Sequence, residues 1–305
     1  MHRSREGATL TRVRATDLEI QTPDGRTRVA AVTIPPGYDP QKPSMVLLNI
    51  HGLTSNGWQQ ELLTGMKARA SARNFIVVYP EGTSSATEFA SWNAGVCCPP
   101  AVDKNIDDIG FLRRLLDRLQ ERYCIDAARV FATGMSNGGF LSHRVACELS
   151  DRIAAVAPVA GQMALPSCTP SRPVPVLHFH GGQDPLVPYN GGHPLNLNGF
   201  LDKLLFPSVE DTISGWARRN GCRGGRSVIR TLPDASCAAY ADCAVQSESS
   251  PQRADTVVCT VPRGGHTWPG GSHVADLVLG YTSNDLVASD LMLDFFAAHP
   301  MPPRL

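Results

Sequence analysis

The sequence lacks the features that mark membrane-spanning and nucleic-acid-binding proteins. No apolar run approaches the roughly 18 residues that a membrane span needs, and residues 1–18 carry charge without the apolar core of a signal peptide. Neither sign of charge is in excess, since Lys and Arg number 28 and Asp and Glu also number 28. No basic run occurs either. We therefore expect neither nucleic acid nor a membrane as a partner, and a cytoplasmic protein unless a leader is missing from this sequence.

Internal repeats and low-complexity linkers are also absent, which favours one folded unit. The 305 residues, 42% of them hydrophobic, suffice for one large α/β domain with a full core. We expect residues 1–15 to be a disordered N-terminal extension and residues 16–305 to be a single domain, monomeric in solution.

Short apolar runs alternate with amphipathic stretches along the chain. After a hairpin that turns at Asp24 and Gly25, the apolar runs fit strands buried on both faces of a sheet. These runs are 44–52, 74–82, 129–136, 153–161, 174–182 and 255–265. The helical stretches between them are 57–73, 107–123, 138–150, 208–221 and 284–299. The alternation predicts an α/β fold with a mostly parallel, doubly wound sheet and helices on both faces. Two further segments, 185–207 and 222–255, are expected to be loops over one end of it.

Ser136 lies where one predicted strand gives way to a helix. It is the centre of Gly134–Gly138, GMSNG, a G-x-S-x-G motif in the strand–turn–helix context that the motif requires. Small flanking residues let the chain turn sharply enough to expose the serine hydroxyl. The alternative for so short a match is an ordinary loop, but functional groups in such sheets lie at the carboxyl ends of strands. The position therefore favours a nucleophile.

Two further strand ends carry a carboxylate and a histidine in the order that a serine nucleophile needs. Asp184 follows the strand predicted over 174–180, and His266 follows the strand predicted over 256–262 between glycines. A serine hydroxyl needs a base to take its proton, and the base needs an orienting carboxylate. Taken singly, Asp184 fits a turn and His266 fits the surface. Together with Ser136 they indicate a catalytic triad.

A fourth strand end predicts stabilisation of negative charge. A glycine after the strand at 44–50 lets backbone amides of the segment HGLTSNG point into the cleft. We expect an oxyanion hole made by the amides of Leu53 and Asn137. His51 is expected to be structural, with catalysis as the alternative.

Many phrases of this chain resemble one known family. HGLTSNG, YPEG, SWNAGVCC, DDIGF, ATGMSNGG and GGHTWPGG occur in an order that resembles the bacterial polyhydroxybutyrate depolymerase-like esterases, which merge into the feruloyl esterases. The similarity covers roughly residues 28–298. It implies an α/β-hydrolase fold and a secreted serine esterase without metal or cofactor. It also implies the same triad of Ser136, Asp184 and His266.

The resemblance leaves the ester open. Feruloyl-type or short hydroxyalkanoate esters are expected ahead of polyhydroxybutyrate itself, whether the substrate is a small molecule or a polymer. Trp92, Trp268 and Tyr189 are expected to wall the acyl group, since ester pockets are mostly apolar. His178 and His180 alternate on one buried strand and are expected to be hydrogen-bonded rather than metal-binding. Acyl transfer, peptide cleavage and a catalytically silent binding module remain alternatives on the same fold.

Nine cysteines, an odd number, bear on location and cross-linking. Four of them cluster between Cys222 and Cys259 in a loop-like stretch, where disulfides of an oxidising compartment make more sense than cytosolic thiols. The spacing is too loose to favour a zinc site. We expect a secreted or periplasmic protein, with a bridge from Cys222 to Cys259 and another from Cys237 to Cys243.

Overall fold

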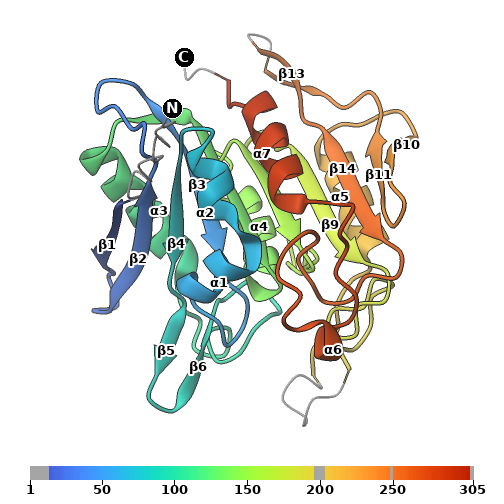
Figure 1. Ribbon diagram of the computed structural model, residues 1–305, viewed down its shortest axis with the longest axis horizontal. Helices are drawn as coiled ribbons and strands as arrows, with labels where there is room; N and C mark the ends of the chain where they lie inside the picture. Colours follow the sequence, from blue (N-terminus) through green and yellow to red (C-terminus); the bar gives the residue numbers. More distant parts are fainter. Residues whose placement is uncertain (1–13, 196–202, 248–249, 303–305) are drawn as a thin grey trace, which may run out of the picture.

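One ten-stranded sheet runs through the residues that the computed structural model describes, which are 14–195, 203–247 and 250–302 (Figure 1). The inner strands pair in parallel, and the two outer strands at each edge pair antiparallel. In spatial order the strands are β1 (Arg14–Gln21), β2 (Thr27–Ile34), β4 (Phe75–Pro80), β3 (Ser44–Ile50), β7 (Ile125–Met135), β8 (Ala155–Val159), β9 (Val176–Gly181), β14 (Thr256–Val261), β11 (Ser236–Tyr240) and β10 (Arg226–Thr231).

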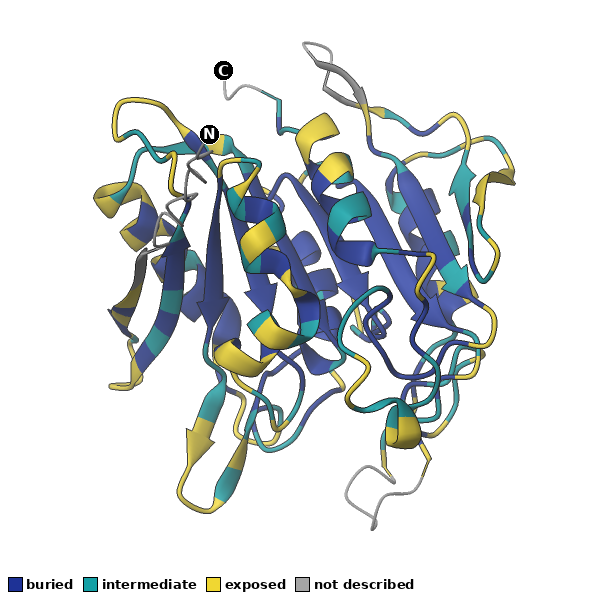
Figure 2. Cartoon of the chain, viewed as in Figure 1, coloured by how far each residue is buried: buried dark blue, intermediate teal, exposed yellow. Residues whose placement is uncertain are grey.

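Helices cover both faces of the sheet, as the alternation predicts. One face carries α1 (Gly57–Thr64), α2 (Met66–Ser71) and α7 (Ala288–Ala298), and the other carries α3 (Asp108–Arg122), α4 (Asn137–Glu148) and α5 (Val209–Arg219) (Figure 1). Separate hydrophobic cores fill the two sides. The central strands are consequently buried on both faces (Figure 2), which is why β4 and β8 read as continuous apolar runs.

The N-terminal hairpin forms as predicted, with a small difference at its start. The turn between β1 and β2 contains Gly25 at a φ of +79°, a conformation that glycine adopts without cost. Residues 1–13 lie outside the described residues, so the predicted extension stays a prediction there. Arg14 and Ala15, assigned to that extension, already pair with β2.

Two other predictions of local structure are corrected. The single helical stretch at 57–73 is two helices, because Gly65 adopts a φ of +57° and its amide caps the end of α1 on the Glu61 carbonyl. Part of the predicted loop at 222–255 forms β10 and β11, which extend the sheet beyond β14. Smaller elements are β5 (Thr83–Ser85), β6 (Glu88–Ser91), β12 (Val245–Ser247), β13 (Ser250–Arg253) and α6 (Asp276–Leu279).

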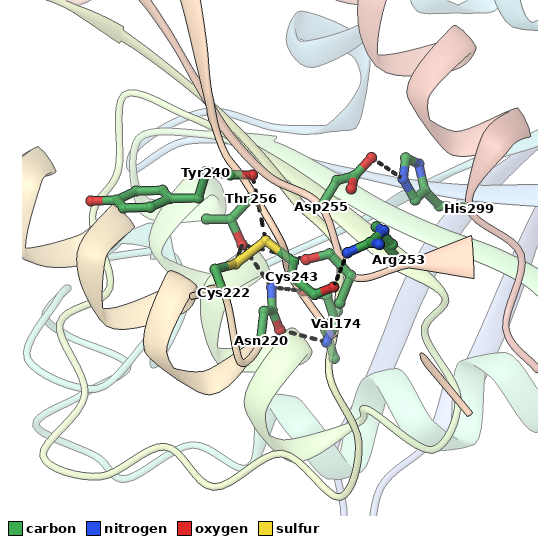
Figure 3. Close-up of a disulfide and its surroundings, with 10 residues drawn as sticks. Val174, Asn220, Cys222, Tyr240, Cys243, Arg253, Asp255, Thr256 and His299 are labelled. Carbon is green, nitrogen blue, oxygen red and sulfur yellow. Dashed lines mark hydrogen bonds and ion pairs between the residues drawn. A yellow bond between two sulfur atoms is a disulfide. The ribbon is translucent and has the colours of Figure 1, made fainter. Parts of the chain in front are cut away.

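The disulfide pairing differs from the expected one. Cys237 and Cys259 are directly opposite each other on the antiparallel strands β11 and β14, and they form a bridge. Cys222, after α5, bonds Cys243 (Figure 3). Both predicted pairings are therefore wrong. Cys237 lies on β11, which was predicted to be a loop, and the register of β11 with β14 places it opposite Cys259. Two more bridges join Cys97 to Cys98 and Cys147 to Cys168, and Cys124 is free.

Asn220 anchors the far ends of two strands beside the Cys222–Cys243 bridge. Its side-chain Oδ1 accepts from the Val174 backbone amide at 3.0 Å, and its side-chain Nδ2 donates to the Val174 carbonyl and the Thr256 hydroxyl at 2.8 and 2.9 Å (Figure 3). Val174 precedes β9, and Thr256 begins β14. The amino ends of these neighbouring strands are thus held together, and their carboxyl ends lead to Asp184 and His266.

None of the helices in the described part of the chain combines the length and the apolar character that a membrane span needs.

Candidate active site

Ser136 occupies a strained turn between β7 and α4. Its φ of +56° and ψ of −118° lie outside the regions that L-residues favour. The backbone packs closely around this turn, and the neighbouring glycines leave room for it because they have no side chain. A Cβ at Gly134 would lie 2.6 Å from the Ile50 carbonyl oxygen, and one at Gly138 would lie 2.2 Å from the same atom. The two glycines of the motif are therefore required by close backbone contact with the end of β3.

His266 and Asp184 meet at the carboxyl ends of β14 and β9. The His266 Nδ1 atom lies 2.7 Å from Asp184 Oδ2, and the other carboxylate oxygen accepts from the amides of Leu186 and Val187 at 2.9 and 2.8 Å. The His266 amide donates to the Leu279 carbonyl at 2.7 Å. Both partners are held in place from more than one direction, as an orienting pair requires.

Asp184 is buried yet remains ionised. Burial alone would raise the pKa of its carboxyl group, but His266, with smaller contributions from His180 and the Val187 amide, outweighs that effect and holds the pKa below its ordinary value. A carboxylate at this position favours the Nδ1–H tautomer of His266. The Nε2 atom of His266 is then the one available as a base.

The loop after β3 lies against Ser136. A Cβ at Gly52 would be 3.4 Å from the Ser136 Cβ and 3.3 Å from the Met135 carbonyl oxygen. The Leu53 amide makes no backbone hydrogen bond to any residue in the described ranges. Asn137 begins α4, where the first amides have no partner within the helix. Both amides expected in the oxyanion hole therefore flank Ser136 as potential donors.

Trp92 and the Asn137 side chain connect this loop to the turn at Ser136. The Asn137 amide group accepts from the Trp92 amide at 2.8 Å and donates to the Trp92 carbonyl at 3.1 Å, and the Trp92 indole donates to the His51 carbonyl at 3.0 Å. The His51 Nε2 atom accepts from the Gly82 amide at 2.9 Å. Burial lowers the pKa of His51 to about 4, so the ring is neutral and structural.

One cavity of about 410 Å³ is lined by both Ser136 and His266. Its lining includes Phe140, Phe206 and the bonded pair Cys97 and Cys98. The two phenyl rings are 4.9 Å apart between centroids, at an interplanar angle of 35°. The cavity thus has an aromatic, apolar part of its lining beside Ser136.

The three aromatic residues expected to contact substrate lie elsewhere. Trp92 and Trp268 are each 0% exposed and do not line this cavity. The Trp92 indole donates to the His51 carbonyl in the loop after β3, and the Trp268 indole donates to the Ser289 hydroxyl at 3.0 Å. Tyr189 packs its ring edge-on against His180 and places its hydroxyl 3.2 Å from that of Thr260. The prediction that these three residues contact the acyl group is therefore wrong: they pack in the protein outside the cavity that Ser136 lines.

His178 and His180 are hydrogen-bonded to each other, as expected, with 3.1 Å between the His178 Nε2 and His180 Nδ1 atoms. Within the described residues, no group of three or more His, Cys, Asp or Glu side chains is placed to hold a metal ion.

Comparison with known proteins places the chain in a family. The family model described as phospholipase/carboxylesterase matches residues 32–212. The chain belongs to this family. A putative esterase, NocK, of Nocardia uniformis subsp. tsuyamanensis is 31% identical to this member over 287 residues, which cover 89% of this chain and 79% of that protein. Feruloyl esterase B of Piromyces equi is 31% identical over 258 residues, covering 82% of this chain and 45% of that protein. The chain therefore spans less than half the length of the Piromyces relative.

The fold of this phospholipase/carboxylesterase family member also matches solved structures. The acetyl xylan esterase from Aspergillus awamori superposes with a TM-score of 0.59 and 14% identity, covering 92% of this chain and 99% of that one. Such similarity establishes the α/β-hydrolase fold. It confirms the doubly wound architecture and the resemblance to feruloyl esterase-like proteins.

Sequence reasoning missed the cavity wall of this family member. Phe140 is four residues after Ser136 on α4, one helical turn away, and that spacing could have indicated a side chain on the same side as the nucleophile. The adjacent cysteines in SWNAGVCC were another available signal. Phe206 belongs to a long connection with no periodic pattern, and nothing in the sequence places it near Ser136.

Proposed function

We propose that this protein is a serine carboxylesterase in which Ser136 is the nucleophile, His266 the general base and Asp184 the carboxylate that orients it. The observation that carries the proposal is the 2.7 Å contact between His266 and Asp184 at the cavity that Ser136 also lines. Membership of the phospholipase/carboxylesterase family supports it.

The proposed reaction has two halves. The Ser136 Oγ atom attacks the ester carbonyl carbon while His266 Nε2 takes the hydroxyl proton, and the amides of Leu53 and Asn137 stabilise the negative oxygen of the tetrahedral intermediate. His266 then gives its proton to the leaving alcohol, and an acyl-enzyme remains. Water attacks this ester with the same base, releasing the acid and restoring Ser136.

We further propose feruloyl-type esters as substrates, with short soluble esters also accepted. The aromatic lining at Phe140 and Phe206 suits an aromatic acyl group. The relatives named feruloyl esterase support this choice. Four disulfides among the described residues favour an exported protein in an oxidising compartment.

A panel of esters tests the proposal. Purified protein should hydrolyse methyl ferulate with a higher kcat/KM than p-nitrophenyl acetate, with hydroxybutyrate oligomers and an acetylated xylan as the other substrates. Hydrolysis confined to hydroxybutyrate oligomers would replace the aromatic acyl group by an aliphatic one. A protein that cleaves no ester in the panel would contradict the esterase assignment itself.

Replacing Phe206 by alanine should raise KM for methyl ferulate several-fold and leave KM for p-nitrophenyl acetate nearly unchanged. Aromatic stacking contributes roughly 0.5–1.5 kcal/mol beyond the buried area, and an acetyl group is too small to use it. Steady-state kinetics on both esters measure the difference. Phe206→Leu is the matched control, because it keeps an apolar side chain but removes the ring. Equal losses on both esters would remove Phe206 from the acyl pocket.

A further inference from the structure

A row of buried histidines lies behind the Asp184 carboxylate. His180 on β9 places its Nε2 atom 2.8 Å from the Val187 carbonyl oxygen and 3.5 Å from Asp184 Oδ2. Its Nδ1 atom meets His178 Nε2 at 3.1 Å. Beyond His178, the ring of His143 stacks at 5.5 Å between centroids. The proposed reaction uses none of these three rings.

The hydrogen bonds fix which nitrogen of His180 carries its proton. A carbonyl oxygen only accepts, so the Nε2 atom that faces Val187 must be the donor. Burial lowers the pKa of His180, and the neutral ring then has a bare Nδ1 atom. His178 donates to that atom. The N–H of His180 therefore donates to the Val187 carbonyl, and Asp184 Oδ2 lies 3.5 Å from the same nitrogen.

The turn from Asp184 to Val187 is consequently held from two sides. Its own amides at Leu186 and Val187 donate to Asp184 Oδ1, and His180 binds the carbonyl that closes the turn. His266 approaches Asp184 Oδ2, the oxygen that His180 also faces. The carboxylate cannot rotate away from His266 without breaking these contacts.

We propose that His180 is a positioning residue, which holds the Asp184 turn and limits how strongly the carboxylate attracts a proton on His266. The inference rests on the proposed function. His180 itself does not touch the reacting atoms. Its N–H withdraws electron density from Asp184 Oδ2, so its loss leaves a carboxylate that stabilises the protonated form of His266 more strongly.

The groups that face His180 are few. His178 lies on the same strand, Asp184 and His266 come from the loops after β9 and β14, and the Tyr189 ring packs edge-on at 5.8 Å. Glu210 of α5 lies behind Tyr189, 3.1 Å from its hydroxyl, and His143 of α4 lies behind His178. Among the described residues, Asp184 and His266 are the groups next to the ring that carry charge in the proposed catalytic cycle, so a changed pH profile reports on that pair.

His180→Phe tests the proposal by removing both ring nitrogens while keeping the ring. We expect kcat per active site, counted by titration with a phosphonate, to fall about 100-fold, because a misplaced catalytic group costs about that factor. The acid limb of kcat/KM should move to higher pH. His180→Gln keeps an N–H that can reach Val187 and should recover at least tenfold of the loss.

His178→Phe is the matched control, since it removes an equally buried ring one step further from Asp184. It should keep kcat within about threefold and leave the acid limb in place. Equal kcat losses in His178→Phe and His180→Phe with an unmoved acid limb would overturn the proposal, because packing alone would explain them. Should His180→Phe not fold, His180→Asn decides: the shorter amide cannot reach Val187, and activity equal to that of His180→Gln would overturn the proposal. A wild-type protein without esterase activity would instead contradict the proposed function.

Discussion

Replacing Ser136 by alanine should lower kcat for any ester substrate by roughly a million-fold. Residues of a triad act as a unit, and the loss of the nucleophile removes the acyl-enzyme route entirely. The residual rate would come from the oxyanion donors and substrate binding alone. Steady-state hydrolysis of p-nitrophenyl acetate by the purified variant measures this, with the background rate of the ester subtracted.

Ser142→Ala is the matched control for this variant. Ser142 lies on α4, the helix that follows Ser136, has the same side chain, and its hydroxyl donates to the Gly138 carbonyl at 2.7 Å. It should keep kcat within about tenfold of the wild-type value. If Ser136→Ala retained a tenth of the wild-type activity in a clean preparation, another residue would have to be the nucleophile.

The protein should unfold in mild acid. His51, His143, His178 and His180 are buried and neutral, and burial lowers each pKa, to about 4 for His51 and about 3 for His143. In the unfolded chain each histidine takes a proton near pH 6.5. The unfolded state therefore binds more protons below that pH, and the free energy of unfolding falls as the pH falls.

The size of this effect is large compared with the usual stability of a domain. Each histidine that stays neutral removes about 1.4 kcal/mol of unfolding free energy per pH unit, and four remove on the order of 5 kcal/mol per pH unit. Since domains are stable by roughly 5–15 kcal/mol, a loss of this size over about one to two pH units below 6.5 removes much of the stability. Urea unfolding followed by circular dichroism between pH 7 and 4 measures the slope. His143→Gln should reduce that slope by about one proton, and an unchanged slope in this variant would show that His143 does not contribute.

Much of the catalytic end was predictable because its requirements are local. A nucleophile turn needs glycines next to the serine, and Gly134 and Gly138 meet the Ile50 carbonyl too closely for any side chain. A base and its carboxylate are expected after strands of a parallel sheet, and Asp184 and His266, the residues proposed for these roles, follow the neighbouring strands β9 and β14. Requirements of this kind involve residues close together in the chain, so they can be recognised in the sequence.

Contacts between distant segments were not predictable in the same way. The Trp92 indole is a suitable side chain for contacting substrate, but whether it faces a cavity or the core depends on packing that spans the whole sheet. The prediction of the cysteine pairing was wrong for a related reason, since Cys237 lies opposite Cys259 only when β11 pairs with β14. The cavity wall joins Phe140 to Phe206, which are far apart along the chain.

The connection between Trp92 and its neighbours limits how this protein could be redesigned. Asn137 is bonded to both backbone polar groups of Trp92, and the Cys98 amide donates to the Trp92 carbonyl at 3.0 Å. The segment that contributes Cys97 and Cys98 to the pocket and the turn that holds Ser136 are thus connected by hydrogen bonds. An engineer who enlarges the pocket at Cys97 and Cys98 would also disturb the amide of Asn137. New substrate range is easier to obtain at Phe206, which approaches the pocket from a separate connection and leaves the catalytic geometry alone.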